Sequence, residues 1–142
     1  MKVSDPPPAA ITITCLADAC QALAIAAQED LPVALINQVD GARSLGVHWI
    51  HEVFCQAMAT APRARALGLV DCGDQGGHAM TALALAAHDP RLAVIFKGPA
   101  DIAIASIAEK RGVRLLLQRP STFEPANHPN WEAAFRDWLM KD

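Results

Sequence analysis

Tyrosine is absent from this chain of 142 residues, and aromatic residues of all kinds make up only 5% of it. Proteins that bind single strands of nucleic acid stack bases on aromatic rings, so this scarcity argues against such a role. Clusters of lysine and arginine are also missing, and the formal net charge is -3. The sequence therefore offers no basic surface for nucleic acid or for an anionic membrane, and we expect neither as a partner.

Long apolar runs are missing as well. No run reaches the ~18 apolar residues that a membrane span needs, and the N-terminal stretch MKVSDPPPAA lacks the apolar core of a signal peptide. The four cysteines, Cys15, Cys20, Cys55 and Cys72, include no Cys-x-x-Cys pair. We therefore expect free thiols in a cytoplasmic protein. No Walker or dinucleotide-binding motif is present, and we expect no cofactor.

The sequence is instead rich in hydrophobic residues, which make up 52% of it against 19% for charged residues. One domain with a sizeable core is expected for this length. Apolar, β-prone runs at 10–16, 33–38, 65–71, 92–96 and 113–118 alternate with alanine-rich helical stretches at 17–29, 47–60, 78–87 and 100–112. This alternation predicts a single α/β domain over 10–118 with a five-stranded parallel sheet whose two faces are both covered.

The two ends of the chain differ from this core. Three consecutive prolines predict a short extended arm over 1–9, and the proline-rich stretch 119–129 reads as a loop. The stretch 130–142 predicts a C-terminal helix in which one apolar stripe is formed by Trp131, Phe135, Trp138 and Leu139. That stripe must bury either on the domain or on a partner subunit.

The order of these segments resembles a known family. LPVALINQVDGARSLGVHWIHEVFCQAM is similar to the second βα unit of class II fructose-bisphosphate aldolases, and ALGLVDCGDQGGHAMTALAL to the third, whose strand ends in His-Leu-Asp-His-Gly. LAVIFKG resembles the fourth strand of that family, and IAEKRGVRLLL the helix and strand that follow. The resemblance covers about residues 11 to 118 and implies a relative of the N-terminal half of a (βα)8 barrel.

Carried over residue by residue, the resemblance is incomplete. Asp71 matches the family's proton-transfer Asp and Gly73 matches its Gly, whereas Cys72 stands where a metal-binding His would be and Gly68 where the first His of the motif would be. The Glu-x-Glu pattern of the fifth strand is replaced by apolar residues and a glutamine at 115–118. The resemblance therefore implies a degenerate relative without aldolase activity, because most of the metal ligands are missing.

A sheet of five strands cannot close into a barrel, so its second face needs a cover. The strands can take the flavodoxin-like order 2-1-3-4-5, with helices on both faces in three layers, and we favour this order. Alternatively, the order is sequential in a (βα)5 half-barrel, and the open face is covered by the C-terminal helix or by a second subunit. We expect a homodimer in either case.

Polar residues follow several of the predicted strands. The carboxyl ends of parallel strands meet at one edge of the sheet, where ligands of such proteins bind. Asp71 is the candidate catalytic residue. The candidate ligand-binding residues at the same edge are Asn37, Gln38, Asp40, Cys72, Gly73, Asp74, Gly76, Gly77, His78, Lys97 and Arg119.

Two interpretations of the third strand end remain open. The backbone of Gly76 and Gly77 would let N–H groups approach an anion at a helix N-terminus. Alternatively, Asp74 or Gln75 caps that helix and the glycines only form the turn. Cys72 at this position also suggests a thiol nucleophile, although the neighbouring acids would raise its pKa.

No metal site is expected. Cys72 and His78 do not have a recognised ligand spacing. On a helix over 48–55, His48, His51 and Cys55 lie close enough together to gather a metal ion, but the order is not His-Glu-x-x-His. We expect these histidines to be solvated or satisfied by other contacts on a helix that packs through its apolar residues.

These patterns favour a domain without catalytic activity that binds a small polar or anionic metabolite or a protein partner. The alternative is a small lyase or isomerase that uses Asp71 as an acid or base, with or without the help of a metal ion.

Overall fold

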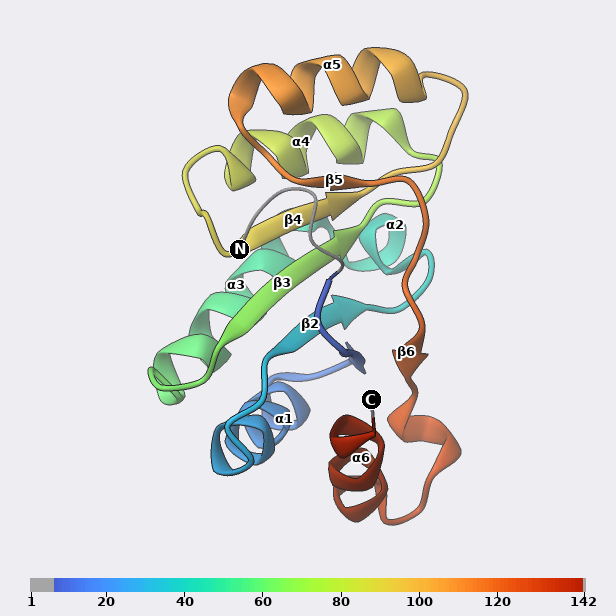
Figure 1. Ribbon diagram of the computed structural model, residues 1–142. Helices are drawn as coiled ribbons and strands as arrows, with labels where there is room; N and C mark the ends of the chain where they lie inside the picture. The colour runs from blue at the N-terminus through green and yellow to red at the C-terminus, as the bar shows by residue number, and fades with distance from the viewer. Residues whose placement is uncertain (1–6, 142) are drawn as a thin grey trace.

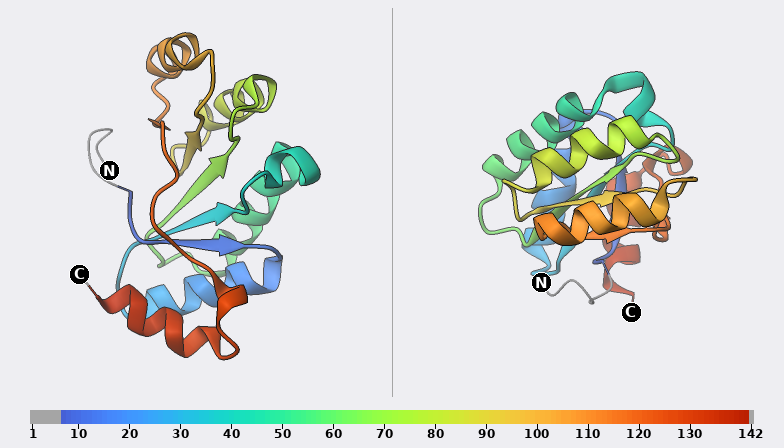
Figure 2. Two further views of the ribbon diagram at one scale, coloured as in Figure 1. Left: turned by 90° about the vertical axis from the view of Figure 1, so that its right-hand side faces the viewer. Right: turned by 90° about the horizontal axis from the view of Figure 1, so that it is seen from above.

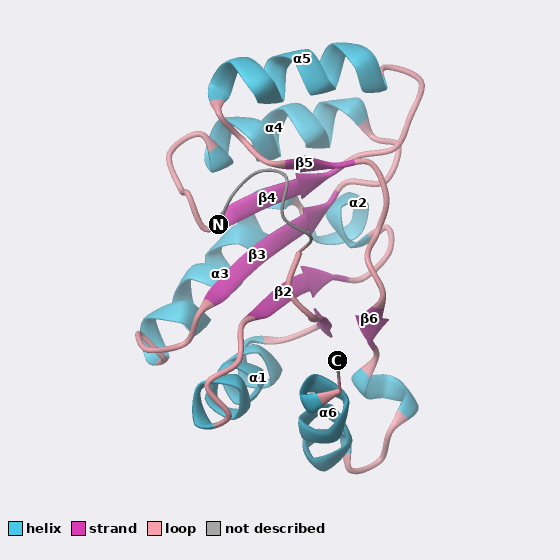
Figure 3. Ribbon diagram, in the orientation of Figure 1, coloured by secondary structure: helices cyan, strands magenta, loops and turns pink. Residues whose placement is uncertain are grey.

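The computed structural model describes residues 7–141 (Figure 1), so most of the predicted N-terminal arm lies outside the described residues. Strands and helices alternate along most of the chain, as the sequence predicts (Figure 3). The strands are β1 (Ala10–Ile13), β2 (Val33–Asn37), β3 (Ala66–Asp71), β4 (Leu92–Ile95), β5 (Leu115–Leu116) and β6 (Thr122–Phe123). The helices are α1 (Leu16–Gln28), α2 (Gly41–Leu45), α3 (Val47–Thr60), α4 (Gly76–Ala86), α5 (Asp101–Arg111) and α6 (Trp131–Met140), with a 3-10 turn at Pro125–Asn127.

The sheet is parallel throughout, which confirms the predicted α/β class, but it has six strands rather than five. The additional strand β6 and the 3-10 turn lie within 119–129, which was expected to be a loop. β6 has only two residues and is flanked by prolines, so no alternating pattern marks it in the sequence.

The strand order is β5-β4-β3-β2-β1-β6. The favoured order 2-1-3-4-5 is therefore wrong, and the first five strands follow the sequential order of a half-barrel. Right-handed crossovers between neighbouring parallel strands place every connecting helix on the same face. Accordingly, α1, α3, α4 and α5 form an arc outside the fan of strands (Figure 2).

The inner face of the sheet carries a small hydrophobic cluster of its own, although the connecting helices lie on the other face. These residues are all buried, with exposed fractions of 0 to 7%: Ala10, Ala34, Ile36, Leu67, Leu69, Ala93 and Ile95. Leu116 packs against them from β5. The larger outer core joins the opposite faces of the strands to the helices.

The helix α6 closes the β6 edge of the sheet. Its residues Phe135 and Leu139 are buried in the outer core, and the ring centroids of Phe135 and Phe123 are 5.4 Å apart. Trp138 also contacts the Phe123 ring, at 5.6 Å between centroids. The apolar stripe thus packs within the chain, beside α1 and β6, and does not cover the inner face (Figure 1).

Two further features bear on the sequence expectations. Gly112 ends α5 with a φ of 67°, the left-handed conformation that is typical of a glycine C-cap. Among residues 7–141, no helix has the length and hydrophobicity that crossing a membrane requires.

Candidate functional site

The segment between β5 and β6 runs past the carboxyl ends of the other strands (Figure 1). Arg119 lies on this segment and binds residues at those strand ends. Its Nη1 donates to Asp71 Oδ2 at 2.9 Å and to the backbone oxygen of Asn37 at 2.8 Å. Its Nη2 donates to Thr12 Oγ1 at 3.1 Å and lies 3.8 Å from Glu124 Oε1. One guanidinium group therefore joins the ends of β1, β2 and β3.

The candidate catalytic residue Asp71 lies on the inner face, where only 8% of its side chain is exposed. Its Oδ2 accepts the hydrogen bond from Arg119, and its Oδ1 accepts one from the backbone N–H of Gly73 at 2.9 Å. Gly73 has a φ of 56°, a backbone conformation that residues other than glycine rarely adopt. Because both carboxylate oxygens are engaged, a proton transfer by Asp71 would first require its ion pair to open.

Asn37 and Cys72 do not face this edge of the inner surface, because neighbouring residues of a strand point to opposite faces. The amide of Asn37 is buried and binds the backbone: Nδ2 donates to Asp71 O at 3.0 Å, and Oδ1 accepts from Asp71 N–H at 2.7 Å. Asn37 thereby fixes the ends of β2 and β3 relative to each other. These two hydrogen bonds give its amide a structural role that needs no ligand.

Cys72 lies in the outer core with 2% of its surface exposed. Burial, together with the negative charge of Asp71, raises the pKa of its thiol to about 12. The thiol is therefore protonated at neutral pH, which disfavours the nucleophile interpretation. Gly68, the position at which class II aldolases carry a histidine, also faces outward: a Cβ on Gly68 would lie 2.7 Å from Phe54 Cδ2, so α3 leaves no room there for an imidazole.

The β3–α4 turn holds the other candidate residues. Gln75 occupies the N-cap position of α4 but makes no side-chain capping bond, and its Nε2 donates instead to Asp74 Oδ1 at 2.6 Å. The predicted side-chain cap is therefore wrong for both residues. Gly76 and Gly77 form the first turn with open space around them, and His78 follows, half-buried.

Two loops are tied together beside this turn. The backbone N–H of Lys97 donates to Gly73 O at 2.8 Å, while the Lys97 side chain is exposed. A Cβ added to Gly73 would lie 3.9 Å from Asp40 Oδ1, which places the exposed Asp40 close to the same turn. The structure thus brings the side chain of Asp40 and the backbone of Lys97 to the turn at Gly73.

Two adjoining cavities flank Arg119. One, of about 210 Å³, is lined by Thr12, Thr14, Asp18, Gln38, Glu124, Pro125, Ala126 and Trp131. The other, of about 420 Å³, is lined by Gln38, Val39, Arg119 and Glu124. The two share Gln38 and Glu124 and so form one continuous polar surface at the carboxyl edge.

Sequence reasoning identified Gln38 and Arg119 in this surface but missed the rest of it. Thr12 and Thr14 could have been found, because Thr14 follows β1 just as Gln38 follows β2, and Thr12 lies near the carboxyl end of β1. Glu124 and Trp131 could not, because they reach the edge through β6, which carries no sequence pattern of its own.

The charge of this surface is negative. Asp18 and Glu124 both line the smaller cavity, and the positive charge of Arg119 is already paired with buried Asp71. Hydroxyl, amide and carboxylate oxygens supply the polar part of the walls, and Pro125, Ala126 and the half-buried Trp131 supply the apolar part. Such walls accept hydrogen bonds from a ligand and repel an anion.

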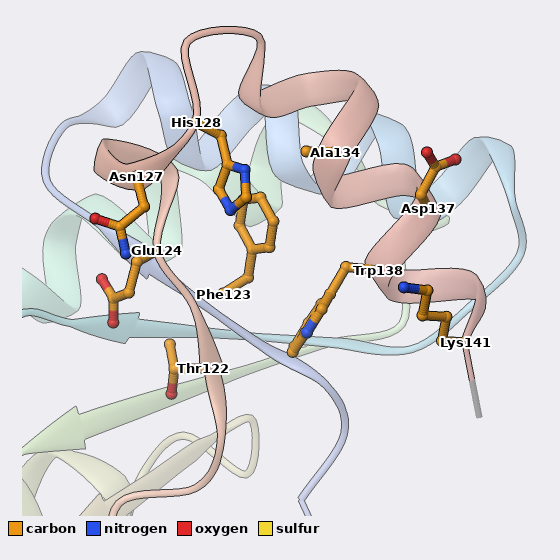
Figure 4. Close-up of a pocket in the computed structure, with 9 residues that line it drawn as sticks. All are labelled: Thr122, Phe123, Glu124, Asn127, His128, Ala134, Asp137, Trp138 and Lys141. Atoms are coloured by element: carbon orange, nitrogen blue, oxygen red, sulfur yellow. The ribbon is translucent and has the colours of Figure 1, made fainter.

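A further hollow, of about 410 Å³, lies between β6 and α6 (Figure 4). The His128 ring stacks on Phe123 with centroids 4.8 Å apart. The polar residues Asn127 and Glu124 lie at one end and Asp137 and Lys141 at the other (Figure 4). Its polar groups therefore do not converge on one point, in contrast to those around Arg119.

The histidine-containing helix α3 forms a separate cluster on the outer side of the sheet. His51 Nε2 lies 3.0 Å from Asp89 Oδ2 and 3.3 Å from Cys55 Sγ, whereas His48 is exposed. Burial and the nearby Asp89 carboxylate raise the pKa of the Cys55 thiol. Burial acts to raise the pKa of Asp89, but hydrogen bonds from His51 and from the Arg91 backbone outweigh it and lower that pKa overall.

Comparisons with known protein families, with curated proteins and with solved structures gave no match to this chain. Function is therefore inferred from the chain's own side chains and cavities. Among the described residues, the surface around Arg119 gathers polar groups from four different strand ends, and it lies where parallel α/β proteins bind ligands.

Proposed function

We propose that this chain is a binding domain without catalytic activity, and that it holds a small, uncharged, hydroxyl-rich metabolite at the carboxyl edge of its sheet. The observation that carries the proposal is the pair of cavities that share Gln38 and Glu124 beside Arg119. Their volumes suit a molecule of sugar or polyol size, smaller than a nucleotide.

The wall chemistry supports this ligand class. Glu124 and Asp18 offer carboxylate oxygens that accept hydrogen bonds from hydroxyl groups, and Gln38 offers both a donor and an acceptor. Trp131 supplies an apolar ring against which the C–H face of a sugar can pack. An anionic metabolite is disfavoured, because two carboxylates face the cavity and the arginine charge is already compensated.

The geometry of Asp71 favours binding over the alternative of a lyase or isomerase. A general base needs a free oxygen within reach of the substrate proton, and both oxygens of Asp71 are occupied by Arg119 and Gly73. A ligand that displaced Arg119 would also have to compensate a buried carboxylate, which is costly.

We also propose descent from the N-terminal half of a class II aldolase barrel. The sequential order of β1 to β5, with the connecting helices outside, supports this relation because it is the arrangement of consecutive units in a (βα)8 barrel. The chain departs from that pattern at β6, which pairs with β1 and not with β5.

Homodimerisation stays a prediction, and the inner face does not require it because its residues are buried within one chain.

The test is a titration of the isotope-labelled chain by NMR with glycerol, erythritol, ribose and glucose, then with putrescine and inorganic phosphate. We expect the neutral polyols to shift the signals of Thr12, Gln38 and the Trp131 indole. Glu124→Gln should weaken this binding roughly tenfold, since a charged hydrogen-bond acceptor is lost. The matched control Glu109→Gln, on exposed α5, should leave it unchanged.

Three outcomes would contradict the proposal. Shifts with phosphate alone would indicate an anion site instead. Absence of shifts at the carboxyl edge with every compound would remove the binding role. Turnover of any of these sugars that Asp71→Asn abolishes, in a variant that stays folded, would establish the enzymatic alternative.

A further inference from the structure

We propose that His51, Cys55 and Asp89 form a zinc-binding site on the outer helix layer. The three offer ligand atoms that all lie within 4.8 Å of one another. The individual separations are 3.0 Å from His51 Nε2 to Asp89 Oδ2, 3.3 Å from His51 Nε2 to Cys55 Sγ, and 3.8 Å from Cys55 Sγ to Asp89 Oδ2. No sequence motif assigns this site, because Asp89 is distant from the other two residues in the chain.

The three ligand atoms are spaced as zinc coordination requires. With zinc–ligand bonds of about 2.0 to 2.3 Å and tetrahedral angles, ligand atoms lie roughly 3.3 to 3.6 Å apart. The three observed separations bracket this range. Small side-chain adjustments are enough for all three atoms to bind one ion. A fourth position would then stay open to solvent, as it does in zinc sites with three protein ligands.

The scaffold holds the ligands in place before a metal arrives. His51 and Cys55 are one turn apart on α3, so their side chains lie on the same face of the helix. Asp89 Oδ1 accepts a hydrogen bond from the Arg91 backbone N–H at 3.0 Å, which leaves Oδ2 directed at α3. This second contact orients the carboxylate in the way that outer-shell hydrogen bonds orient metal ligands.

The type of ligand selects the metal. A thiolate and an imidazole favour zinc over magnesium or calcium, which prefer oxygen ligands only. A catalytic triad does not fit the same residues, because Cys55 and Asp89 both contact the same nitrogen, Nε2. In a triad the nucleophile and the acid bind opposite nitrogens of the ring.

The site is independent of the proposed ligand-binding surface. α3 packs on the outer face of the sheet, whereas Arg119 and its partners occupy the inner edge (Figure 2). The cluster is also accessible, since 21% of the His51 side chain and 16% of the Asp89 side chain are exposed. An ion can therefore reach it without unfolding of the core.

The test uses the whole purified chain, stripped of metal and reduced, and titrates it with zinc against a chromophoric chelator. We expect one zinc ion per chain. Cys55→Ser, His51→Gln and Asp89→Asn should each lower the affinity by at least about a hundredfold. The matched controls are His48→Gln, an exposed histidine of the same helix, and Cys15→Ser, an exposed thiol. Both should bind as the parent does.

Two measurements on the unmodified chain guard against variants that fail to fold. Cobalt in place of zinc should give a near-ultraviolet band from thiolate coordination. Zinc should also protect Cys55, but not Cys15, from alkylation mapped by mass spectrometry. The proposal is overturned if the chain holds no zinc at micromolar concentration, if cobalt shows no thiolate band, or if His48→Gln reduces binding as much as His51→Gln.

Discussion

Two aspartates of this chain, Asp71 and Asp89, illustrate two different ways of holding a carboxylate. Asp71 is buried at the inner edge, and its two oxygens accept hydrogen bonds from Arg119 and from a backbone N–H. Asp89 is half-buried in the outer layer, where one oxygen binds the Arg91 backbone and the other faces a thiol and an imidazole. Both oxygens of Asp71 therefore have partners within the chain, whereas one oxygen of Asp89 faces two side chains that can bind a metal ion with it.

The difference teaches that position in a fold does not by itself make a residue reactive. Asp71 occupies the strand end where active groups of parallel α/β proteins gather, yet its charge is compensated. Asp89 lies in a turn after α4, away from that edge, yet it contacts two zinc-type ligands. Four experiments, by substitution, by pH and by addition of zinc, measure how far the two sites differ.

The largest effect is expected from Asp71→Ala. Removing this carboxylate leaves the largely buried Arg119 guanidinium without its nearest ion-pair partner and with only the more distant Glu124, so the free energy of unfolding should fall by about 3 kcal/mol. Denaturant titration followed by circular dichroism measures this. The double variant Asp71→Ala with Arg119→Met should recover part of the loss, and a double variant less stable than the single one would contradict the ion-pair account.

A smaller effect is expected from the buried thiol next to Asp71. The pKa of Cys72 is raised to about 12 in the folded chain from a usual value of 9.0. The protonated thiol therefore stabilises the fold fully below pH 9, and this contribution is lost progressively as the pH rises towards 12. At pH 10 the loss should be about 1 kcal/mol. Cys72→Ala should show a correspondingly flatter decline of stability between pH 8 and pH 10.

The smallest effect is expected for the metal-free outer cluster. Asp89→Asn and His51→Gln should each change the free energy of unfolding by about 1 kcal/mol or less, because partly exposed ion pairs contribute little. Measured without metal, this contrasts with the large loss expected for Asp71→Ala. A loss of several kcal/mol at Asp89 would mean that the cluster is a structural contact and would erase the difference between the two aspartates.

The fourth change sharpens the comparison by adding the ion. If zinc binds only the folded chain, saturating zinc should raise the unfolding temperature of the parent but not of Asp89→Asn. Asp71→Asn, if folded, should respond to zinc as the parent does. A zinc response that depends on Asp71 would place the metal at the inner edge and contradict the assignment to the outer layer.

The sequence predicted the elements well where hydrophobic patterns are long. The helix expected over 47–60 is α3, since Gly46 precedes a regular apolar stripe that contains Ile50 and Phe54. The strand β6 was not predictable, because two residues between prolines have no period, and its partner Ala10 lies more than a hundred residues away.

Strand order and site geometry depend on tertiary packing, so local patterns could not decide them. Both strand orders fit the same apolar strands, and the small inner-face residues Ala10, Ala34 and Ala93 point to a concave sheet only once the register is known. The facing of Cys72 was available in the sequence, however. If Asp71 faces inward, the next residue of an extended chain faces outward.

The pairing of β6 with β1 has a consequence for how the chain acquires its fold. Ala10 and Ile11 pair with Thr122 and Phe123, so β1 gains its second neighbour only after more than a hundred further residues have been synthesised. Until then β1 is an unprotected edge, open to pairing with another chain. Contacts so distant in sequence also slow folding. The pairing of β6 therefore sets how long this edge of the nascent sheet is exposed to aggregation.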